Sequence, residues 1–454
     1  MTALASLLLP VARWHAEYGF TLADQAVRAV LDRGGLGALV TDGPATEVLA
    51  LTTAWRAQVD RSLIIAAELG GGVGERFDGA TALPPLAAFD IRDLESVRRA
   101  AVLTAREARG AGISWALAPS CVDPTLASAI VRSRTFRGPD EAVTAAVAEW
   151  VDGCQQEGVV AVPGPYPLMQ PAAAAGALDA GPGAMLLAAA HVHDADAIEY
   201  LRHTVGFSGV IIAPVGAVAD QLHEDEEPIA VAALSAGADL LLGLEEPDAV
   251  ERAIAAALRQ GTLDRDALDT AAARVRAWAD WCDPRRGGRP LTLEDALWAR
   301  RAADAAVHTQ RGQVVALLDP VEVVVVDDDP PRRVPAGHVL IETLQRLDHE
   351  ARRVASPTGT IRGPVVVALF GDRRLALGFD IHSDAALARV SEVVARAEAQ
   401  ARDVIVVHFT PAELAAALPA WPTLVCGWGG TRAMEEAVAR WLSRGDGSAH
   451  RAAR

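Results

Sequence analysis

Residues Ala238–Gln260, ADLLLGLEEPDAVERAIAAALRQ, contain the pattern that decides the fold. The short apolar run Ala238–Leu242 predicts a buried strand. The amphipathic stretch Pro247–Gln260, which follows after a short turn, predicts a helix. Together they form one strand–helix unit of the kind that builds a parallel sheet.

The same alternation repeats throughout the part of the chain that precedes Asp283. The other expected strands are Ala38–Thr41, Ser62–Ala67, Ser114–Pro119, Val159–Val162, Ala184–Ala190 and Gly209–Ala213. Expected helices between them include Leu94–Ala111 and Asp140–Glu157. About seven or eight such units fit a (β/α)8 TIM-type barrel. The alternative is an open doubly wound sheet, which has fewer strands and a shorter span.

A second, smaller α/β sandwich domain is expected after the break at Asp283–Pro290, DPRRGGRP. Its expected strands are Val321–Val326, Val365–Phe370, Val404–Phe409 and Thr423–Cys426. Its expected helices are Gly337–Ala355, Asp384–Ala401 and Arg432–Leu442, with one more at Leu293–Ala306 before them. The predicted domains are a barrel at 1–282, a linker and helix at 283–312, the sandwich at 313–445 and a tail at 446–454.

Composition excludes several classes of partner. The 454-residue chain has a formal net charge of −17, which argues against nucleic acid because phosphate backbones require clustered Lys and Arg. No basic amphipathic stretch suits an anionic membrane surface. The four cysteines lack ligand spacing, so we expect free, buried thiols and no zinc site. The N-terminus has an apolar run without a basic region or cleavage site, which predicts a cytoplasmic protein.

Six segments, in order, resemble family 3 glycoside hydrolases of the β-N-acetylhexosaminidase type. They are Ala66–Phe77 (AAELGGGVGERF), Ala105–Pro119 (AREARGAGISWALAP), Ser133–Phe136 (SRTF), Met185–Val192 (MLLAAAHV), Leu201–Ile212 (LRHTVGFSGVII) and Ala233–Leu242 (ALSAGADLLL). The resemblance covers most of residues 10–280, and it implies the barrel fold, glycosidase ancestry and no cofactor or metal. The C-terminal segment also resembles the sandwich domain that is often attached in this family.

The residue that attacks the sugar in this family is missing here. The resemblance places the nucleophilic Asp directly after the G-F-x-G-V-V strand, where this chain has Ala213-Pro214. Proline has no ionisable group, so no covalent glycosyl intermediate forms at this position. The next acid, Asp220, lies beyond the strand end and would need a rebuilt loop to replace the lost residue.

The family's proton-donating loop is also changed. Where the resemblance implies a K-H-F-P-G-H-G motif, this chain has Ala161–Gln170, AVPGPYPLMQ, with neither Lys nor His. Asp179 is the one acid nearby, and we interpret it as a solvated loop carboxylate. The Ala-, Gly- and Pro-rich stretch Leu168–Gly183 predicts a flexible or shortened cap. We therefore assign no catalytic residue.

The resemblance places four side chains at substrate positions of the family: Glu68, where the family has an Asp that binds sugar hydroxyls, Arg76, Arg134, and His191, whose family counterpart is structural or close to the substrate. Carboxylates and guanidinium groups are good hydrogen-bond partners for hydroxyls and amides. The competing interpretation for Glu68 and Arg76 is a mutual salt bridge, and for Arg134 an ion pair near a strand end.

Other chemistry-bearing residues have weaker signals. His191 and His193 lie beside Asp194 and Asp196 in AHVHDAD, which would suit a metal by spacing, although the resembling family uses none. Cys121 follows a strand end without an identifiable base, so we expect a packing role. The turn Gly427–Gly430 could face an anion at a helix start, and a tight turn explains it equally well.

The leading hypothesis is a catalytically inactive glycosidase-like protein that binds a carbohydrate-like small molecule, with no known protein partner. The first alternative is an active O-glycosyl hydrolase, of β-N-acetylhexosaminidase or β-glucosidase type, with relocated catalytic groups. The second is an enzyme of another class that uses His191, His193, Asp194 and Glu68 at the barrel mouth. The third is an interaction protein, which would display an exposed apolar patch.

Overall fold

The computed structural model describes residues 4–123, 133–282, 290–314, 316–328, 335–371 and 382–445. The predicted tail at 446–454 and residues 283–289 of the predicted linker lie outside these ranges. The chain divides into two compact units. The first holds Met1–Thr81, Ile91–Asp123 and Phe136–Thr292, and the second holds Ala82–Asp90, Pro124–Thr135 and Leu293–Arg454.

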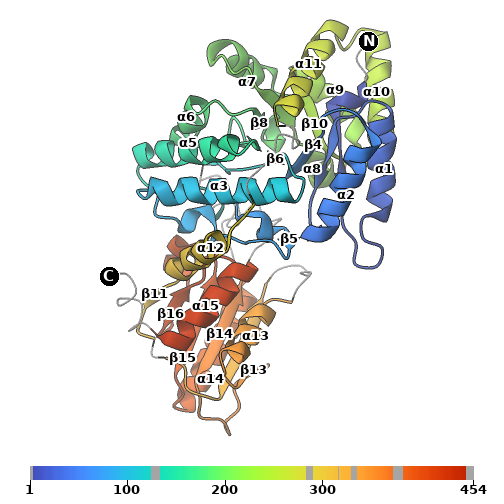
Figure 1. Cartoon of the computed structure of the whole chain (residues 1–454). Helices are drawn as coiled ribbons and strands as arrows, with labels where there is room; N and C mark the ends of the chain where they lie inside the picture. The colour runs from blue at the N-terminus through green and yellow to red at the C-terminus, as the bar shows by residue number, and fades with distance from the viewer. Residues whose placement is uncertain are drawn as a thin grey trace. The chain divides into compact units, whose positions relative to one another are not determined.

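The first unit contains an eight-stranded parallel sheet that curves into a barrel (Figure 1). Its strands are β1 (Leu8–Ala12), β2 (Gly37–Val40), β4 (Ile64–Ala67), β6 (Trp115–Ala116), β7 (Val160–Ala161), β8 (Ala184–Leu186), β9 (Val210–Ala213) and β10 (Leu240–Leu244). The sheet order is β7-β6-β4-β2-β1-β10-β9-β8. After β7, the Pro163 carbonyl accepts from the Leu186 amide at 3.0 Å, and the Tyr166 amide donates to the Leu186 carbonyl at 2.9 Å. These bonds nearly close the barrel, and the predicted (β/α)8 fold is confirmed.

Helices follow the strands around the barrel. They are α1 (Thr21–Asp32), α2 (Ala45–Gln58), α3 (Leu94–Gly110), α5 (Asp140–Gln156), α6 (Pro171–Asp179), α7 (Ala195–Glu199), α8 (Val215–Leu222), α9 (Glu226–Ala236), α10 (Pro247–Gln260) and α11 (Arg265–Trp281). Val275, Ala279 and Cys282 join the same core cluster as Leu36 and Ile64, which lie at the starts of strands. Helix α11 and its end therefore cover the amino-terminal end of the barrel, and the loops at the carboxyl end are left to form a site.

The second unit is a six-stranded sheet with the order β11-β16-β15-β14-β12-β13. Its strands are β11 (His308–Arg311), β12 (Val321–Asp327), β13 (Ala351–Arg353), β14 (Val365–Phe370), β15 (Val404–Phe409) and β16 (Leu424–Cys426). Its helices are α12 (Leu293–Ala306), α13 (His338–Arg346), α14 (Asp384–Ala399) and α15 (Arg432–Arg444). Within the described residues, β11 pairs with β16 in an antiparallel manner, and the other strand pairs of this sheet are parallel.

Strand β14 shows why this unit is a three-layer sandwich. Val366, Ala368 and Phe370 pack in one core cluster with residues of α13 and α15, whereas the alternating Val365, Val367 and Leu369 pack in another with residues of α14. Successive side chains of a strand point to opposite faces, so a strand covered on both faces needs an unbroken apolar run.

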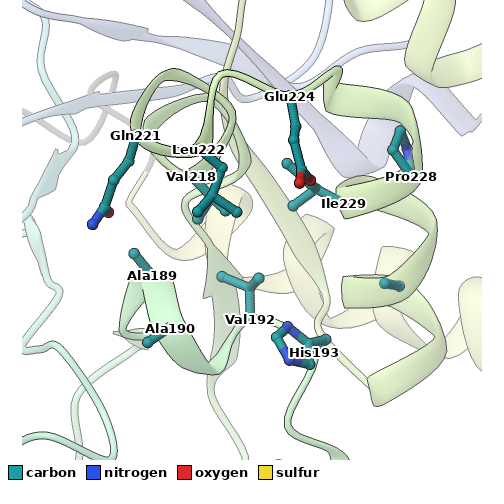
Figure 2. Close-up of a pocket in the computed structure, with 11 residues that line it drawn as sticks. Ala189, Ala190, Val192, His193, Val218, Gln221, Leu222, Glu224, Pro228 and Ile229 are labelled. Carbon is teal, nitrogen blue, oxygen red and sulfur yellow. The ribbon is translucent and has the colours of Figure 1, made fainter.

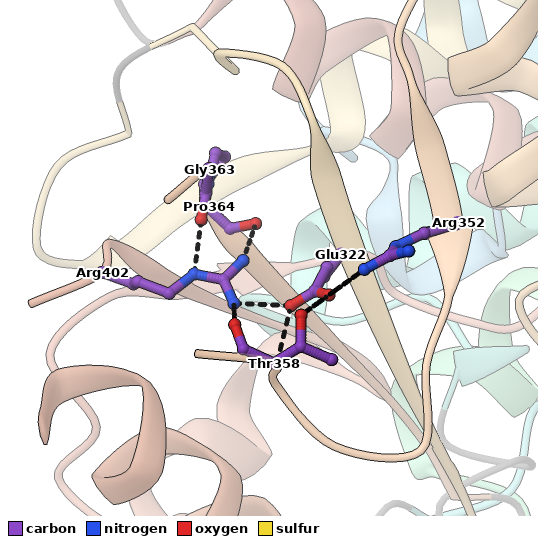
Figure 3. Close-up of polar contacts among 6 residues, drawn as sticks. All are labelled: Glu322, Arg352, Thr358, Gly363, Pro364 and Arg402. Carbon is purple, nitrogen blue, oxygen red and sulfur yellow. Dashed lines mark hydrogen bonds and ion pairs between the residues drawn. The ribbon is translucent and has the colours of Figure 1, made fainter. Parts of the chain in front are cut away.

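Strand β12 brings a buried charge into this mostly apolar sheet. Glu322, in β12, is fully buried, and its Oε2 accepts from Nη1 of the equally enclosed Arg402 at 2.5 Å. Figure 3 shows that Arg352 and Thr358 also reach this carboxylate. Burial alone would raise the pKa of Glu322, but the hydrogen bonds from Arg402, Thr358 and Arg352 outweigh it and lower the pKa to about 2.

Several predicted elements are wrong in detail. The helix expected over Gly337–Ala355 ends at Arg346 because Asp348 adopts a left-handed φ of 66°, and the chain then forms the edge strand β13. The strand expected over Ala184–Ala190 ends at Leu186, and a 3-10 turn, η4 (Ala189–His191), follows.

Two elements of the barrel unit, strand β1 and helix α6, were not predicted. Strand β1 lies in the N-terminal apolar run and is wholly buried between β2 and β10. The expected flexible stretch Leu168–Gly183 contains helix α6, since Pro171 begins it and alanines, which are strong helix formers, fill it. Asp179 is the last residue of this helix and not a loop carboxylate.

Candidate functional site

The carboxyl ends of the barrel strands carry a group of charged side chains. Arg13 follows β1, Glu68 follows β4 and Glu245 follows β10. In a barrel of this type these ends meet at one face, where functional loops gather. The charged residues therefore define the barrel mouth as the candidate site.

Arg13 links two carboxylates at the mouth. Its Nε donates to Oε1 of Glu245 at 2.7 Å, and its Nη2 lies 3.7 Å from Oδ2 of Asp220 on α8. Asp220, which we considered as a replacement nucleophile, is 70% exposed and thus lies beside an arginine at the rim. The sequence pattern did not reveal Arg13 or Glu245, because nothing local marks a residue that pairs with a distant part of the chain.

Glu226 anchors the loop that carries Glu245. The buried carboxylate of Glu226 accepts from the backbone amides of Glu245 at 2.8 Å and Glu246 at 3.0 Å. These amides lie at the start of α10, where a negative charge complements the helix dipole. Burial nevertheless raises the pKa of Glu226. Glu226 therefore positions this loop and is not free to act on a ligand.

Pro214 occupies the end of β9. It is the N-cap residue of α8, and Ala213 before it is fully buried in the strand. The helix thus begins where the resembling family has its nucleophilic carboxylate, and this position supplies no acid.

Glu68 and Arg76 contact each other. Oε2 of Glu68 accepts a hydrogen bond from Nη2 of Arg76, which follows the 3-10 turn η2 (Val73–Glu75). The side chain of Glu68 is half exposed, whereas that of Arg76 is 21% exposed. The mutual salt bridge, which was the competing interpretation for Glu68 and Arg76, is therefore formed. Half of the Glu68 side chain remains exposed to solvent.

Arg134 is half-buried between the buried residues Ser133 and Thr135. These residues group with the second compact unit, whereas Glu68, Arg76 and His191 lie in the first. The structure thus brings Glu68 and Arg76 together and assigns Arg134 to a different unit.

His191 lies at the end of η4 and is paired locally. Its Nδ1 is 2.9 Å from Oδ2 of Asp194, and Oδ1 of Asp194 accepts from the Ala197 amide at the start of α7. The hydrogen bond from His191 lowers the pKa of Asp194. The ionised Asp194 accepts a hydrogen bond from Nδ1–H of His191, so Nε2 is the ring nitrogen left to contact a ligand.

Tyr166 is a candidate that sequence reasoning missed. It follows β7 in the stretch that replaces the family's Lys-His motif, and its amide is bound to β8. Burial, together with neighbouring Tyr200 and Asp194, raises the pKa of Tyr166. The phenol therefore stays protonated and can donate a hydrogen bond near His191 and Asp194.

The histidine-rich segment makes no metal centre. Among the described residues no three His, Cys, Asp or Glu side chains gather closely enough to hold a metal ion. His193 is exposed and is not part of the hydrogen bond between His191 and Asp194. No helix within the described ranges is both long and apolar enough to cross a membrane.

Comparisons with known proteins agree with this architecture. Residues 5–166 match the family model for the glycosyl hydrolase family 3 N terminal domain. A β-N-acetylglucosaminidase/β-glucosidase of Cellulomonas fimi is 34% identical over 128 residues, which make up 28% of this chain and only 22% of that protein.

Solved structures match nearly the whole chain. A glycoside hydrolase family 3 β-N-acetylglucosaminidase from Paenibacillus has a TM-score of 0.77 at 20% identity, covering 97% of this chain and 96% of its own. A β-glucosidase from Listeria innocua, solved with glucose, has a TM-score of 0.70 at 18% identity, covering 98% of this chain and 73% of its own. At this identity the likeness shows the fold.

The fold defines a (β/α)8-barrel protein with a second α/β unit. Within that class, residues 5–166 match the glycosyl hydrolase family 3 N terminal domain, and the chain is similar to β-N-acetylglucosaminidases of that family. The resemblance drawn from six short segments is thereby confirmed.

Proposed function

We propose that this protein has lost the hydrolytic chemistry of its family and binds a carbohydrate-like small molecule at the barrel mouth. The observation that carries the proposal is Pro214 at the end of β9, in the place of the nucleophile. A retaining glycosidase needs a carboxylate there and a proton donor about 5 Å away. Without the carboxylate, the cationic transition state loses its nearest counter-charge.

Neighbouring carboxylates do not restore the lost group. Asp220 and Glu245 both lie against Arg13, whose charge reduces their nucleophilicity. The loop after β7 supplies the phenol of Tyr166 where the family has Lys and His, and a phenol is a weak acid at neutral pH. These contacts favour binding over turnover.

The polar groups that remain suit hydroxyl and amide partners. Glu68 offers carboxylate oxygens at half exposure, Arg76 orients it, and His191 presents Nε2. Such side chains bind sugar hydroxyls without needing a nucleophile. The relatives' names, β-N-acetylglucosaminidase and β-glucosidase, make N-acetylglucosamine and glucose the first ligands to test.

A second candidate function is hydrolysis through relocated groups. The pair Asp220 and Glu245 favours it, since two carboxylates at one mouth share a single arginine. An enzyme of another class, using the His191–Asp194 pair as its base, is a third candidate.

We further propose a cytoplasmic location, because all four cysteines are free and buried. Fractionation of the source cells would contradict this if the protein were found outside the cytoplasm.

The deciding experiment measures hydrolysis of 4-nitrophenyl β-N-acetylglucosaminide and β-glucoside by the wild type and by Pro214→Asp. The 4-nitrophenyl group leaves readily, so a missing proton donor limits these substrates little. We expect no turnover by the wild type and measurable hydrolysis by Pro214→Asp. Wild-type turnover that is lost in Asp220→Ala or Glu245→Gln would instead establish the relocated mechanism.

Binding is tested separately by calorimetric titration with N-acetylglucosamine and glucose. We expect binding of one of them that Glu68→Ala weakens about tenfold, which is the effect of one lost hydrogen bond to a charged group. The matched control is Glu141→Ala on α5, an exposed acid away from the strand ends. Failure of both sugars to bind would refute the carbohydrate part of the proposal.

A further inference from the structure

A pocket of about 440 Å³ lies beside the barrel mouth, between η4, α8 and α9. Figure 2 shows it enclosed by the turn after β8 on one side and by the two helices on the other. The lining residues are Ala189, Ala190, Val192, His193, Val218, Gln221, Leu222, Glu224, Pro228, Ile229 and Ala232. None of the proposed sugar-binding residues lines it, so it is a separate site.

The walls of the pocket are mostly apolar. Val192 and Ile229 are buried, and Val218 contributes from the inner side of α8. Its volume is in the range of small-ligand pockets, which are apolar with a few placed polar groups. The walls therefore favour an apolar ligand body over a sugar, whose hydroxyls would stay unsatisfied there.

Two ionisable side chains, Glu224 and His193, reach this pocket. Figure 2 shows the Glu224 carboxylate extending down towards Ile229, with the His193 ring further below, beside Val192. Within the described residues neither side chain makes a hydrogen bond, and His193 interacts electrostatically with the neighbouring Asp194. A carboxylate and an imidazole beside apolar walls are thus available to a ligand.

The end of α8 explains the position of Glu224. His223 adopts a left-handed φ of 55°, and the Glu224 amide then donates to the Ala219 carbonyl at 3.1 Å. This turn ends the helix and directs the chain back over the pocket. The backbone position of Glu224 beside the pocket follows from this turn.

The charge near Glu224 is negative. Asp225 and Glu227 follow it in the sequence and are exposed or half-buried, whereas the intervening Glu226 is committed to the amides of Glu245 and Glu246. An anionic ligand would be repelled here, and a cation would be attracted.

We propose that this pocket binds a small apolar organic cation, such as a primary amine on an alkyl or aryl body. The body fills the space between Val192, Val218 and Ile229. The ammonium group donates to the Glu224 carboxylate. This inference does not depend on whether the barrel mouth binds or hydrolyses a sugar.

The test is calorimetric titration with 2-phenylethylamine, 2-phenylethanol and 3-phenylpropanoate, three ligands of similar shape and different charge. We expect the amine to bind about two- to fivefold more tightly than the alcohol, as an exposed ion pair allows, and the acid to bind weakest. Equal binding of the three ligands would refute the preference for a cation. If the amine did not bind, the proposed site itself would be refuted.

Two variants locate the binding. Ala232→Phe fills the pocket and should abolish amine binding, while Ala236→Phe, one turn further along α9 and outside the lining, should not. Glu224→Gln should remove the preference for the amine over the alcohol, while Glu227→Gln should keep most of it. Circular dichroism verifies that each variant is folded. Amine binding that survives Ala232→Phe would place the amine elsewhere and refute the proposal.

Discussion

Nε of Arg13 donates to Oε1 of Glu245 at 2.7 Å, which joins the ends of β1 and β10, the first and last strands of the barrel. The two strands are neighbours in the sheet, so this ion pair lies over a seam that hydrogen bonds already hold. Its role is to set the charge of the mouth more than to stabilise the fold.

Arg13→Ala should therefore change the free energy of unfolding by less than about 1 kcal/mol. The side chains of Arg13 and Glu245 are 55% and 49% exposed, and solvent screens their attraction. Urea unfolding of the variant and the wild type measures the difference. A loss of several kcal/mol would mean that the pair supports barrel closure.

Glu322→Gln should destabilise the second unit by about 3–5 kcal/mol, because it leaves the buried guanidinium of Arg402 without its counter-charge. The matched control is Glu392→Gln, an exposed glutamate paired with Arg389, which should change stability by less than about 0.5 kcal/mol. Urea unfolding followed by tryptophan fluorescence compares the two. Similar small effects would show that the buried pair contributes little.

Gly176→Ala should destabilise the barrel although alanine is the better helix former. A Cβ at Gly176 would lie 2.1 Å from the backbone oxygen of Thr144 on α5, and such a clash costs about 1–3 kcal/mol. At Gly110, the last residue of α3, a Cβ meets nothing within 4 Å, so Gly110→Ala should stabilise by about 0.5–1 kcal/mol. Thermal unfolding of both variants tests whether the signs are opposite.

The second unit should lose stability as the pH falls. Burial lowers the pKa of His408 to about 3 and that of His382 to about 4 from an ordinary 6.5, so below pH 6.5 the unfolded chain binds protons that the folded chain does not. The pKa of Glu322 is lowered from 4.5 to about 2 in the folded chain, so its protonation causes a further loss of stability between pH 4.5 and 2.

Urea unfolding between pH 7.5 and 3.5 measures this dependence. His408→Gln should reduce the pH dependence of the unfolding free energy between pH 6.5 and 4.5 by about one bound proton. The contribution of His382 should remain. A slope that the substitution does not change would contradict a buried neutral His408.

The native protein should not react with a thiol reagent such as 5,5′-dithiobis(2-nitrobenzoate) at pH 8. Burial raises the pKa values of Cys121, Cys154 and Cys426 to about 12 and that of Cys282 to about 11. The thiols are thus protonated and enclosed. All four should react in guanidinium chloride, and a rapidly reacting thiol in the native state would revive Cys121 as a candidate nucleophile.

Elements with strong local patterns were predictable from the sequence. Pro247–Gln260 and Val365–Phe370 have the predicted bounds, since a helical apolar face and an unbroken β-branched run each have one main interpretation. Helix α6 was missed because its Ala-rich sequence has little amphipathic pattern, and it depends on packing against α5.

The sequence by itself determined the barrel, the resemblance to family 3 glycoside hydrolases and the absence of an acid at Pro214, because strand periodicity and residue identity are local properties. Only the tertiary structure decided that Arg13 meets Glu245, that Glu68 meets Arg76, and that the end of α8 directs Glu224 over a pocket. Those contacts join residues on different strands, turns and helices. Their distances depend on how the barrel curves and how each helix ends, which no short stretch of sequence encodes.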